Sequence, residues 1–412
     1  MLRNPMYVYG SDDAALLAHL HLGKHMLQMF AKYQDNVALI DADTNKKMTF
    51  SELAQLSVDI ALSLKRLNVG VGDVVSICCD KRMEFMPTVV GILCTGAAFS
   101  AADNSMLDDK HRITLSTREW YYSFGLYHSL SSLSRGFTIV FTLKNDAVSY
   151  LEAIEKYKVD TIQIVPTTIT DLVKCPDLDK YDVSSLQVMN CASIPISSEL
   201  VSVTKERFQN LQCVTQIYGL TESGCIIRED VKSGINKLGS VGVACQGTVI
   251  KVVDLETQKP VGPYKRGEIR FKCSYLMSGY IGDEECAYLD EEGFYKSGDV
   301  GYYDDEKYFF IVDRIHEIIK YNGYTLSPSE IENTLVKHPS IREVGVTSLP
   351  FSEAPVAFIV RQTNCAISED QVAEYLSSKM PSVTISGGIR FVDKLPRGAG
   401  TKLNRKALRG MI

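Results

Sequence analysis

The sequence predicts an α/β protein whose N-terminal part is built on a doubly wound, largely parallel sheet. Between residues 138 and 218, apolar strand-like runs alternate with amphipathic helix-like runs, which is the pattern of repeated βαβ units. From residue 238 onward, short strands separated by Gly and Asp turns indicate a β-rich subdomain. Residues 313–412 mix helices and strands, which predicts a small α+β domain.

Composition and charge exclude several classes of protein. The 412 residues are 45% hydrophobic and 23% charged, which is typical of a globular chain with two or three domains. The net charge of -6 lacks the basic excess of nucleic-acid binders, so we expect no nucleic-acid partner. The apolar run Val89–Ala102 is too short for a transmembrane segment and predicts a buried helix and strand.

The N-terminal region is predicted to contain two helices and a strand. Apolar residues at helical spacing predict a helix from Asp12 to about Ala31. Thr49 and Glu52 have capping-box spacing, which predicts that a helix begins there and covers Ser51–Leu67. Val74–Cys79 has the composition of a strand.

Neither histidines nor cysteines predict a metal site. His21 and His25 would share a helix face, but no acidic or cysteine ligand accompanies them. The 11 cysteines are scattered without a CxxC pair, so we expect reduced, mostly buried thiols. Met1–Leu20 carries acidic residues where a secretory signal is apolar, so we expect a cytoplasmic chain.

Regular alternation then defines the remaining elements. In the sheet we expect strand Thr138–Thr142, helix Ala147–Lys158, strand Thr161–Val165, helix Thr167–Cys175, strand Leu186–Cys191, helix Ser197–Phe208 and strand Val214–Tyr218. In the β-rich part we expect strands Val249–Asp254, Glu268–Cys273 and Tyr308–Val312. After Asp313 we expect helix Ser329–Lys337, strands near Glu343–Val346 and over Ala357–Arg361, and helix Ser368–Lys379.

A polar pentapeptide follows the last strand of the alternation. It reads Tyr218-Gly219-Leu220-Thr221-Glu222 and lies where open α/β sheets bind ligands. A hydroxyl can donate to a phosphate oxygen while the next carboxylate holds the accompanying Mg²⁺, so Thr221 and Glu222 suit nucleotide chemistry. A plain turn with a capping threonine is the alternative.

Further motifs follow this pentapeptide along the chain, in a specific order and at specific spacings. They are Gly267-Glu268-Ile269 with Ser278-Gly279-Tyr280, then Tyr295-Lys296-Ser297-Gly298-Asp299, then Phe309-Phe310-Ile311-Val312-Asp313-Arg314 and Ile319-Lys320-Tyr321-Asn322-Gly323-Tyr324. Together they resemble the AMP-forming adenylating enzymes, and the insect luciferase-like and coumarate-CoA ligase branch most of all. The resemblance continues through Ser327–Glu332, His338-Pro339 and Leu395–Gly398 to Lys402–Lys406, so it covers nearly the whole chain.

The resemblance implies a fold and an activity. It implies the adenylating-enzyme fold, with an AMP-binding domain over residues 1–312 and a mobile C-terminal domain over residues 313–412. The activity would be that of an ATP-dependent ligase, which joins a fatty or cinnamic-type carboxylic acid first to AMP and then to coenzyme A. ATP or AMP, Mg²⁺ and coenzyme A would be its cofactors and co-substrates. Many relatives are peroxisomal, but no Ser-Lys-Leu-type end is present here, so the cytoplasmic expectation stands.

The resemblance also assigns nucleotide-binding residues. Thr221 would touch the α-phosphate, and Glu222 would bind Mg²⁺. Asp299 would accept both ribose hydroxyl groups. Tyr218 would pack on the adenine, with Gly219 beside it.

The remaining assignments concern residues of the mobile C-terminal domain. Arg314 would add a charged fork near the ribose and phosphate, and Asp313 would be the hinge. Lys402 would bridge the substrate carboxylate and the α-phosphate during adenylation, as a catalytic residue alongside Thr221 and Glu222. Lys320 and Gly323 would serve the coenzyme A side.

The sequence departs from the family in three places. It lacks the Ser/Thr/Gly-rich loop ending in Pro-Lys-Gly that holds the outer phosphates, and about one hundred residues are missing between Asn104 and Arg112. Tyr121-Tyr122 replaces a His-His pair, which places Tyr122 at the acyl pocket. Ala192-Ser193-Ile194-Pro195 replaces Gly-Gly-Ala-Pro beside the adenine.

These departures leave alternatives open. The chain would be a catalytically impaired splice form or pseudoenzyme that binds AMP, an acyl-adenylate or a partner protein, or the product of a mis-assembled gene model. A luciferin monooxygenase is a further alternative, against which Tyr122 argues. Because the missing loop holds outer phosphates, we expect AMP to lose less affinity than ATP.

Overall fold

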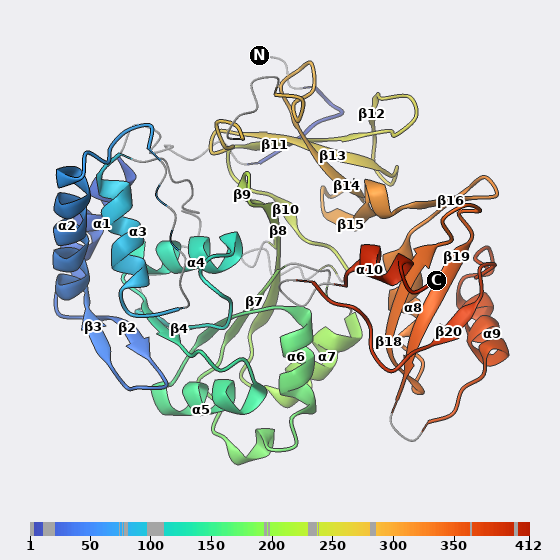
Figure 1. The fold of residues 1–412 in the computed structure, drawn as a ribbon, viewed down its shortest axis with the longest axis horizontal. Helices are drawn as coiled ribbons and strands as arrows, with labels where there is room; N and C mark the ends of the chain where they lie inside the picture. The colour runs from blue at the N-terminus through green and yellow to red at the C-terminus, as the bar shows by residue number, and fades with distance from the viewer. Residues whose placement is uncertain are drawn as a thin grey trace. The chain divides into compact units, whose positions relative to one another are not determined.

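A computed structural model describes most of the chain (Figure 1). The described residues are 4–10, 21–73, 75, 77, 81–96, 111–192, 196, 198–229, 237, 239–280, 286–362, 365–398 and 403–412. They form two compact units, the first comprising Met1–Lys251, Arg270–Tyr295 and Asp304–Phe310, and the second Val252–Ile269, Lys296–Tyr303 and Ile311–Ile412. The predicted domains over residues 1–312 and 313–412 stay a prediction.

The first unit contains a nine-stranded sheet of order β10-β9-β8-β7-β6-β4-β5-β2-β3. The strands are β2 (Val37–Asp41), β3 (Lys47–Thr49), β4 (Ile113–Ser116), β5 (Thr138–Phe141), β6 (Thr161–Ile164), β7 (Val188–Cys191), β8 (Cys213–Leu220), β9 (Gly224–Arg228) and β10 (Val243–Ala244). Pairing is parallel from β2 through β8 and antiparallel at both ends of the sheet. The predicted, largely parallel sheet is confirmed.

Helices cover both faces of this sheet. They are α1 (Leu22–Tyr33), α2 (Phe50–Arg66), α3 (Phe85–Cys94), α4 (Ser123–Ser134), α5 (Ala147–Tyr157), α6 (Pro166–Lys174) and α7 (Ser198–Arg207). Figure 1 shows α1, α2 and α3 side by side. Ile139 belongs to the core formed with α1 to α4, and its neighbour Val140 belongs to the core formed with α5 to α7. Successive strand residues point to opposite faces, so two cores sandwich the sheet as a doubly wound fold requires.

Local chemistry explains where the first helices begin. Thr49 Oγ1 accepts a hydrogen bond from the Glu52 N–H (3.2 Å), and Thr49 N–H donates to the Glu52 carboxylate (2.8 Å), so the predicted capping box is confirmed. His21 caps α1, since its Nδ1 accepts from the Lys24 N–H (3.4 Å). The first half of the predicted helix from Asp12 lies outside the described residues, as does most of the predicted strand Val74–Cys79.

A second sheet contains the predicted short strands. It has the order β1-β11-β13-β14-β15, with β12 beside β11, and its strands are shared between the two units. The strands are β1 (Val8–Tyr9), β11 (Thr248–Val253), β12 (Pro260–Val261), β13 (Gly267–Cys273), β14 (Tyr295–Tyr303) and β15 (Phe309–Arg314).

The C-terminal part of the second unit is the expected α+β module. Strands β18 (Ile341–Ser348), β19 (Pro355–Arg361) and β20 (Ile389–Phe391) form a sheet, and β16 (Ile319–Tyr321) pairs with β17 (Tyr324–Leu326). Helices α8 (Pro328–Leu335), α9 (Glu369–Lys379) and α10 (Arg405–Arg409) accompany them. One apolar core joins residues from β16 to β20 with α8 and α9.

Candidate functional site

The polar pentapeptide forms one end of a β-hairpin. β8 runs to Leu220, two residues further than predicted, and β9 begins at Gly224, so only the three residues between them turn. Gly219 pairs with Cys225 across this hairpin, and a Cβ at Gly219 would lie 2.0 Å from the Gly224 carbonyl oxygen. Glycine is therefore required at this position.

Helix α4 supports the threonine of this turn. Tyr127 Oη donates a hydrogen bond to the Thr221 carbonyl oxygen (2.9 Å), and the Thr221 hydroxyl donates to Ser123 Oγ (3.1 Å). Thr221 itself is exposed, so its side chain is open to a ligand. Ser123 and Tyr127 are additions to the predicted site, because no motif marks them in the sequence.

The carboxylate of the turn lies against a cluster of tyrosines. Tyr280 Oη donates to Glu222 Oε1 (2.6 Å) and lies 2.9 Å from Tyr295 Oη. The Glu222 carbonyl accepts from the Met277 N–H (2.8 Å), so the backbone of this turn is held as well. Burial, together with the Tyr280 contact, raises the pKa of Tyr295. A tyrosine hydroxyl therefore orients the half-buried Glu222 carboxylate.

The second unit places Asp299 beside Arg314. Arg314 Nε lies 2.8 Å from Asp299 Oδ1, and Arg314 Nη1 donates to the Ser297 carbonyl (3.2 Å). The Asp299 side chain is 6% exposed, whereas that of Arg314 is 42% exposed. Gly298 precedes the aspartate at a φ of 69°, a conformation that favours glycine. The Asp299 carboxylate is therefore buried, and the more exposed Arg314 guanidinium lies on its solvent side.

The hinge candidate Asp313 is hydrogen-bonded to the segment that follows it. Its Oδ2 accepts from Ser327 Oγ (2.8 Å) and from the Ser329 N–H (2.9 Å), and its Oδ1 accepts from the Arg314 N–H (2.9 Å). These bonds join the end of β15 to the first turn of α8. The hinge role of Asp313 stays a prediction.

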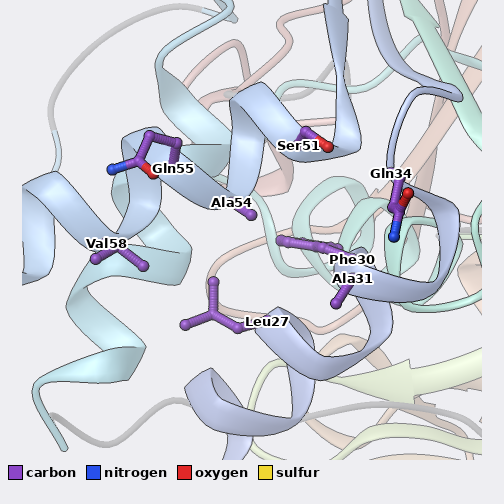
Figure 2. A pocket seen from close by; sticks show the side chains of 8 residues that line it. All are labelled: Leu27, Phe30, Ala31, Gln34, Ser51, Ala54, Gln55 and Val58. Carbon is purple, nitrogen blue, oxygen red and sulfur yellow. The ribbon is translucent and has the colours of Figure 1, made fainter.

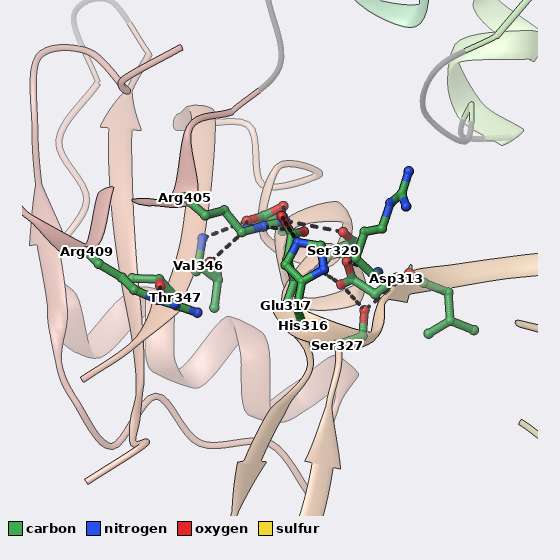
Figure 3. A network of polar contacts seen from close by, with 12 residues as sticks. Asp313, His316, Glu317, Ser327, Ser329, Val346, Thr347, Arg405 and Arg409 are labelled. Carbon is green, nitrogen blue, oxygen red and sulfur yellow. Dashed lines mark hydrogen bonds and ion pairs between the residues drawn. The ribbon is translucent and has the colours of Figure 1, made fainter. Parts of the chain in front are cut away.

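Arg405 organises the C-terminal segment, as Figure 3 shows. Its guanidinium donates to Glu317 (Nε to Oε2, 2.8 Å), to Glu332 (Nη2 to Oε2, 3.0 Å; Nη1 to Oε1) and to the Val346 carbonyl (2.7 Å). Burial raises the pKa of Glu332 despite this partner. The network anchors the segment 403–412. Lys402, which precedes this segment, lies outside the described residues.

The coenzyme A candidates lie on the hairpin formed by β16 and β17. Lys320 is exposed on β16, and Gly323 lies in the turn with Asn322, both at positive φ. An Asn-Gly pair is the preferred sequence for such a two-residue turn.

The acyl-pocket candidate Tyr122 immediately precedes α4. Its ring packs on that of Tyr121 (centroids 4.7 Å apart) and lies under the Arg118 guanidinium. Further along α4, the half-buried His128 contacts Ser132 Oγ through Nδ1 (3.4 Å) and accepts a hydrogen bond at Nε2 from Asn190 Nδ2 (3.3 Å). Burial lowers the pKa of His128 to about 3, so the ring is neutral.

A groove of about 410 Å³ lies between α1 and α2. Figure 2 shows the side chains of Leu27, Phe30 and Ala31 from one helix and Ala54 and Val58 from the other around it. The groove is lined by apolar and amide groups and contains no predicted site residue. It therefore plays no part in the candidate site.

The predicted residues fall into two sets. The first unit brings together Tyr218, Gly219, Thr221 and Glu222, and the second unit brings together Asp299, Asp313 and Arg314, with Lys320 and Gly323 on its hairpin. Of the adenine-side stretch, only Ala192 is described, and it is buried. No helix in the described part of the chain is long and apolar enough to cross a bilayer.

A family model for "AMP-binding enzyme" matches residues 27–115 and 102–281, more than half of the chain. The chain belongs to the AMP-binding enzyme family. The model of this family's C-terminal domain matches residues 330–402. The predicted resemblance is confirmed.

Curated members of the family are similar over most of this chain. A luciferin 4-monooxygenase of Nipponoluciola cruciata is 38% identical over 301 residues, 71% of this chain and 54% of that protein. A 4-coumarate-CoA ligase of Pinus taeda is 36% identical over 292 residues, 69% of this chain and 54% of that protein. The chain thus spans about half the length of these relatives.

Solved structures show the same fold. ATP-bound MatB from Rhodopseudomonas palustris matches with a TM-score of 0.84 and 19% identity over 94% of this chain and 98% of that one. The anthranilate CoA ligase AuaEII, in complex with anthranoyl-AMP, matches with a TM-score of 0.83 and 18% identity over 95% and 96%. The predicted adenylating-enzyme fold is confirmed.

Proposed function

We propose that the chain is an AMP-forming acid–thiol ligase, which activates a carboxylic acid with ATP and transfers the acyl group to coenzyme A. The observation that carries the proposal is the turn Thr221-Glu222, in which an exposed hydroxyl and an oriented carboxylate are adjacent. Family membership and relatives named as CoA ligases support it.

The residues of the turn suit the α-phosphate. The Thr221 hydroxyl can turn from Ser123 to donate to a phosphate oxygen, while Tyr127 holds the threonine backbone in place. Asp299 offers two carboxylate oxygens to the ribose hydroxyl groups, and Arg314 Nε lies 2.8 Å from one of them. Arg314 is exposed enough to contact a phosphate as well.

A magnesium ion fits the donor set of the turn. Glu222 keeps its carboxylate half-buried and oriented by Tyr280, and Mg²⁺ is usually held by one or two carboxylates together with substrate phosphates. When bound, the ion would neutralise the negative charge of the phosphates.

In the proposed reaction, a carboxylate oxygen of the acid attacks the α-phosphorus of ATP, and pyrophosphate leaves. The products are acyl-AMP and pyrophosphate. The coenzyme A thiol then attacks the acyl carbon, loses its proton, and AMP leaves. Lys402 would place a positive charge between the acid and the α-phosphate in the first step, and Lys320 and Gly323 would serve the second. Fatty and cinnamic-type acids are the proposed substrates.

Pyrophosphate release tests the proposal. The purified chain is incubated with Mg²⁺-ATP, coenzyme A and a panel of fatty and cinnamic acids, and acyl-CoA is followed in parallel by mass spectrometry. We expect acid-dependent release that falls at least tenfold in Lys402→Ala and is unchanged in Lys406→Ala, which alters an exposed lysine four residues further along the sequence. Release that is independent of the acid, or equal in both variants, would contradict the proposal.

An impaired form that only binds nucleotide is the second candidate. The sequence holds no Pro-Lys-Gly loop, and the family model matches in two segments that overlap at residues 102–115, as an internal shortening would produce. This candidate predicts that AMP binds at least as tightly as ATP. Calorimetric affinities for the two nucleotides, combined with an absence of pyrophosphate release from folded protein, would favour it over the ligase.

A further inference from the structure

Two cysteines lie face to face beside the nucleotide motif. Cys225 is on β9, three residues after Glu222, and Cys245 follows β10. Their sulfur atoms are 3.5 Å apart, whereas a disulfide needs about 2.05 Å. The gap to be closed is therefore within the reach of side-chain rotation.

The backbone of each cysteine is held by the sheet. Cys225 pairs with Gly219 across the hairpin, and its carbonyl accepts from Tyr275 Oη (3.1 Å). The Cys245 N–H donates to the Ile226 carbonyl (2.9 Å), one residue along β9 from Cys225. Because both main chains are fixed on neighbouring strands, the sulfur atoms stay close whenever the sheet is intact.

The two thiols differ in accessibility. Cys225 is half-buried, whereas Cys245 is 8% exposed. A reagent from solvent therefore reaches Cys225 first, and Cys245 is positioned to react second. Cys273 lies on β13 in the same unit, but burial raises its pKa to about 12, which keeps that thiol protonated.

We propose that Cys225 and Cys245 form a reversible disulfide, a modification site whose co-reactant is a low-molecular-weight disulfide such as glutathione disulfide. The Cys225 thiol loses its proton to solvent and attacks one sulfur of glutathione disulfide, which gives a mixed disulfide and one glutathione thiolate. Cys245 then loses its proton and attacks the sulfur of Cys225, which releases the second glutathione. Two protein thiols are oxidised, and one glutathione disulfide is reduced to two thiols. This inference does not depend on the proposed ligase activity.

The test equilibrates the reduced full-length protein with defined ratios of glutathione to glutathione disulfide, followed by alkylation and mass measurement. We expect an intact mass lower by two hydrogen atoms, two fewer alkylated cysteines and full reversal by dithiothreitol. Trypsin should yield peptide 208–228 joined to peptide 238–251. A stable glutathione adduct at Cys225 without closure, or no reaction at all, would overturn the proposal.

Matched variants assign the bond. Peptide 208–228 also contains Cys213, so the joined peptide must persist in Cys213→Ser and in Cys273→Ser and must disappear in Cys225→Ser and in Cys245→Ser. Circular dichroism of each reduced variant shows that the sheet is intact. A joined peptide that survives in folded Cys225→Ser would exclude this pair.

Discussion

Tyr280 Oη donates a 2.6 Å hydrogen bond to Glu222 Oε1 across 58 residues of sequence. The bond joins the Ser278-Gly279-Tyr280 motif to the Thr221-Glu222 turn within one unit. Two motifs that are separate in the sequence therefore act on one carboxylate, and the tyrosine is a positioning residue for the proposed magnesium ligand.

We expect Tyr280→Phe to weaken Mg²⁺-dependent ATP binding about fivefold, because a partly exposed hydrogen bond to a charged group contributes roughly 1 kcal/mol. Calorimetric ATP titrations over a range of Mg²⁺ concentrations measure the effect. Tyr288→Phe is the matched control, since its ring packs on Tyr280 but its hydroxyl contacts Cys286. Equal losses of ATP affinity in both variants would attribute the effect to ring packing rather than to the hydrogen bond with Glu222.

We expect Asp299→Asn to lower AMP affinity by about tenfold or more, because the charged acceptor for the ribose and the partner of Arg314 are lost together. Fluorescent AMP-analogue binding is the measurement. Asp305→Asn, which removes an exposed carboxylate just after β14 in the sequence, should bind AMP normally. An unchanged affinity in Asp299→Asn would remove this residue from the site.

We expect Arg405→Met to reduce the free energy of unfolding by about 3–5 kcal/mol, because it leaves Glu332, whose side chain is only 16% exposed, without its cation. Urea unfolding of the full chain, followed by fluorescence, measures this. The double variant with Glu332→Met should recover part of the loss. Arg266→Met breaks an ion pair with Glu330 that is exposed on both sides, and it should cost about 1 kcal/mol or less.

The stability of the first unit should fall in mild acid because of His128. Burial lowers the pKa of this imidazole from 6.5 to about 3. Between these two pH values the imidazole therefore binds a proton in the unfolded chain but not in the folded chain. The stability contributed by the neutral ring is complete above pH 6.5 and is lost as pH falls toward 3, by about 1.4 kcal/mol for each pH unit. Urea unfolding between pH 7 and pH 4 should show a shallower pH dependence in His128→Asn than in the parent chain, with a substitution at exposed His316 as the control.

Most elements could be predicted because their apolar residues either form short continuous runs or repeat with a regular period. The sequence predicts β5, β6 and β7 as strands, of which β5 and β6 are buried along their whole length, and it predicts α2 from its capping box. Helix α4 was not predicted, since it is serine-rich and buried on several sides, which removes the apolar periodicity.

The sequence predicts which residues belong to the candidate site, but it does not predict the contacts between them. Ser123 and Tyr127 meet Thr221 from 98 and 94 residues away, and sequence spacing carries no signal for such pairs. Strand β8 also extends beyond the predicted end at Tyr218, because pairing with β9 continues to Leu220.

The sequence by itself determined the family, the alternation of the parallel sheet and the residues that suit nucleotide chemistry, because these depend on local pattern and motif order. Only the tertiary structure decided that Tyr280 orients Glu222, that Arg405 neutralises Glu332 and that two cysteines 20 residues apart face each other. Those relationships arise when sheet pairing brings distant segments within hydrogen-bonding distance, and the energy of burial then selects the partners.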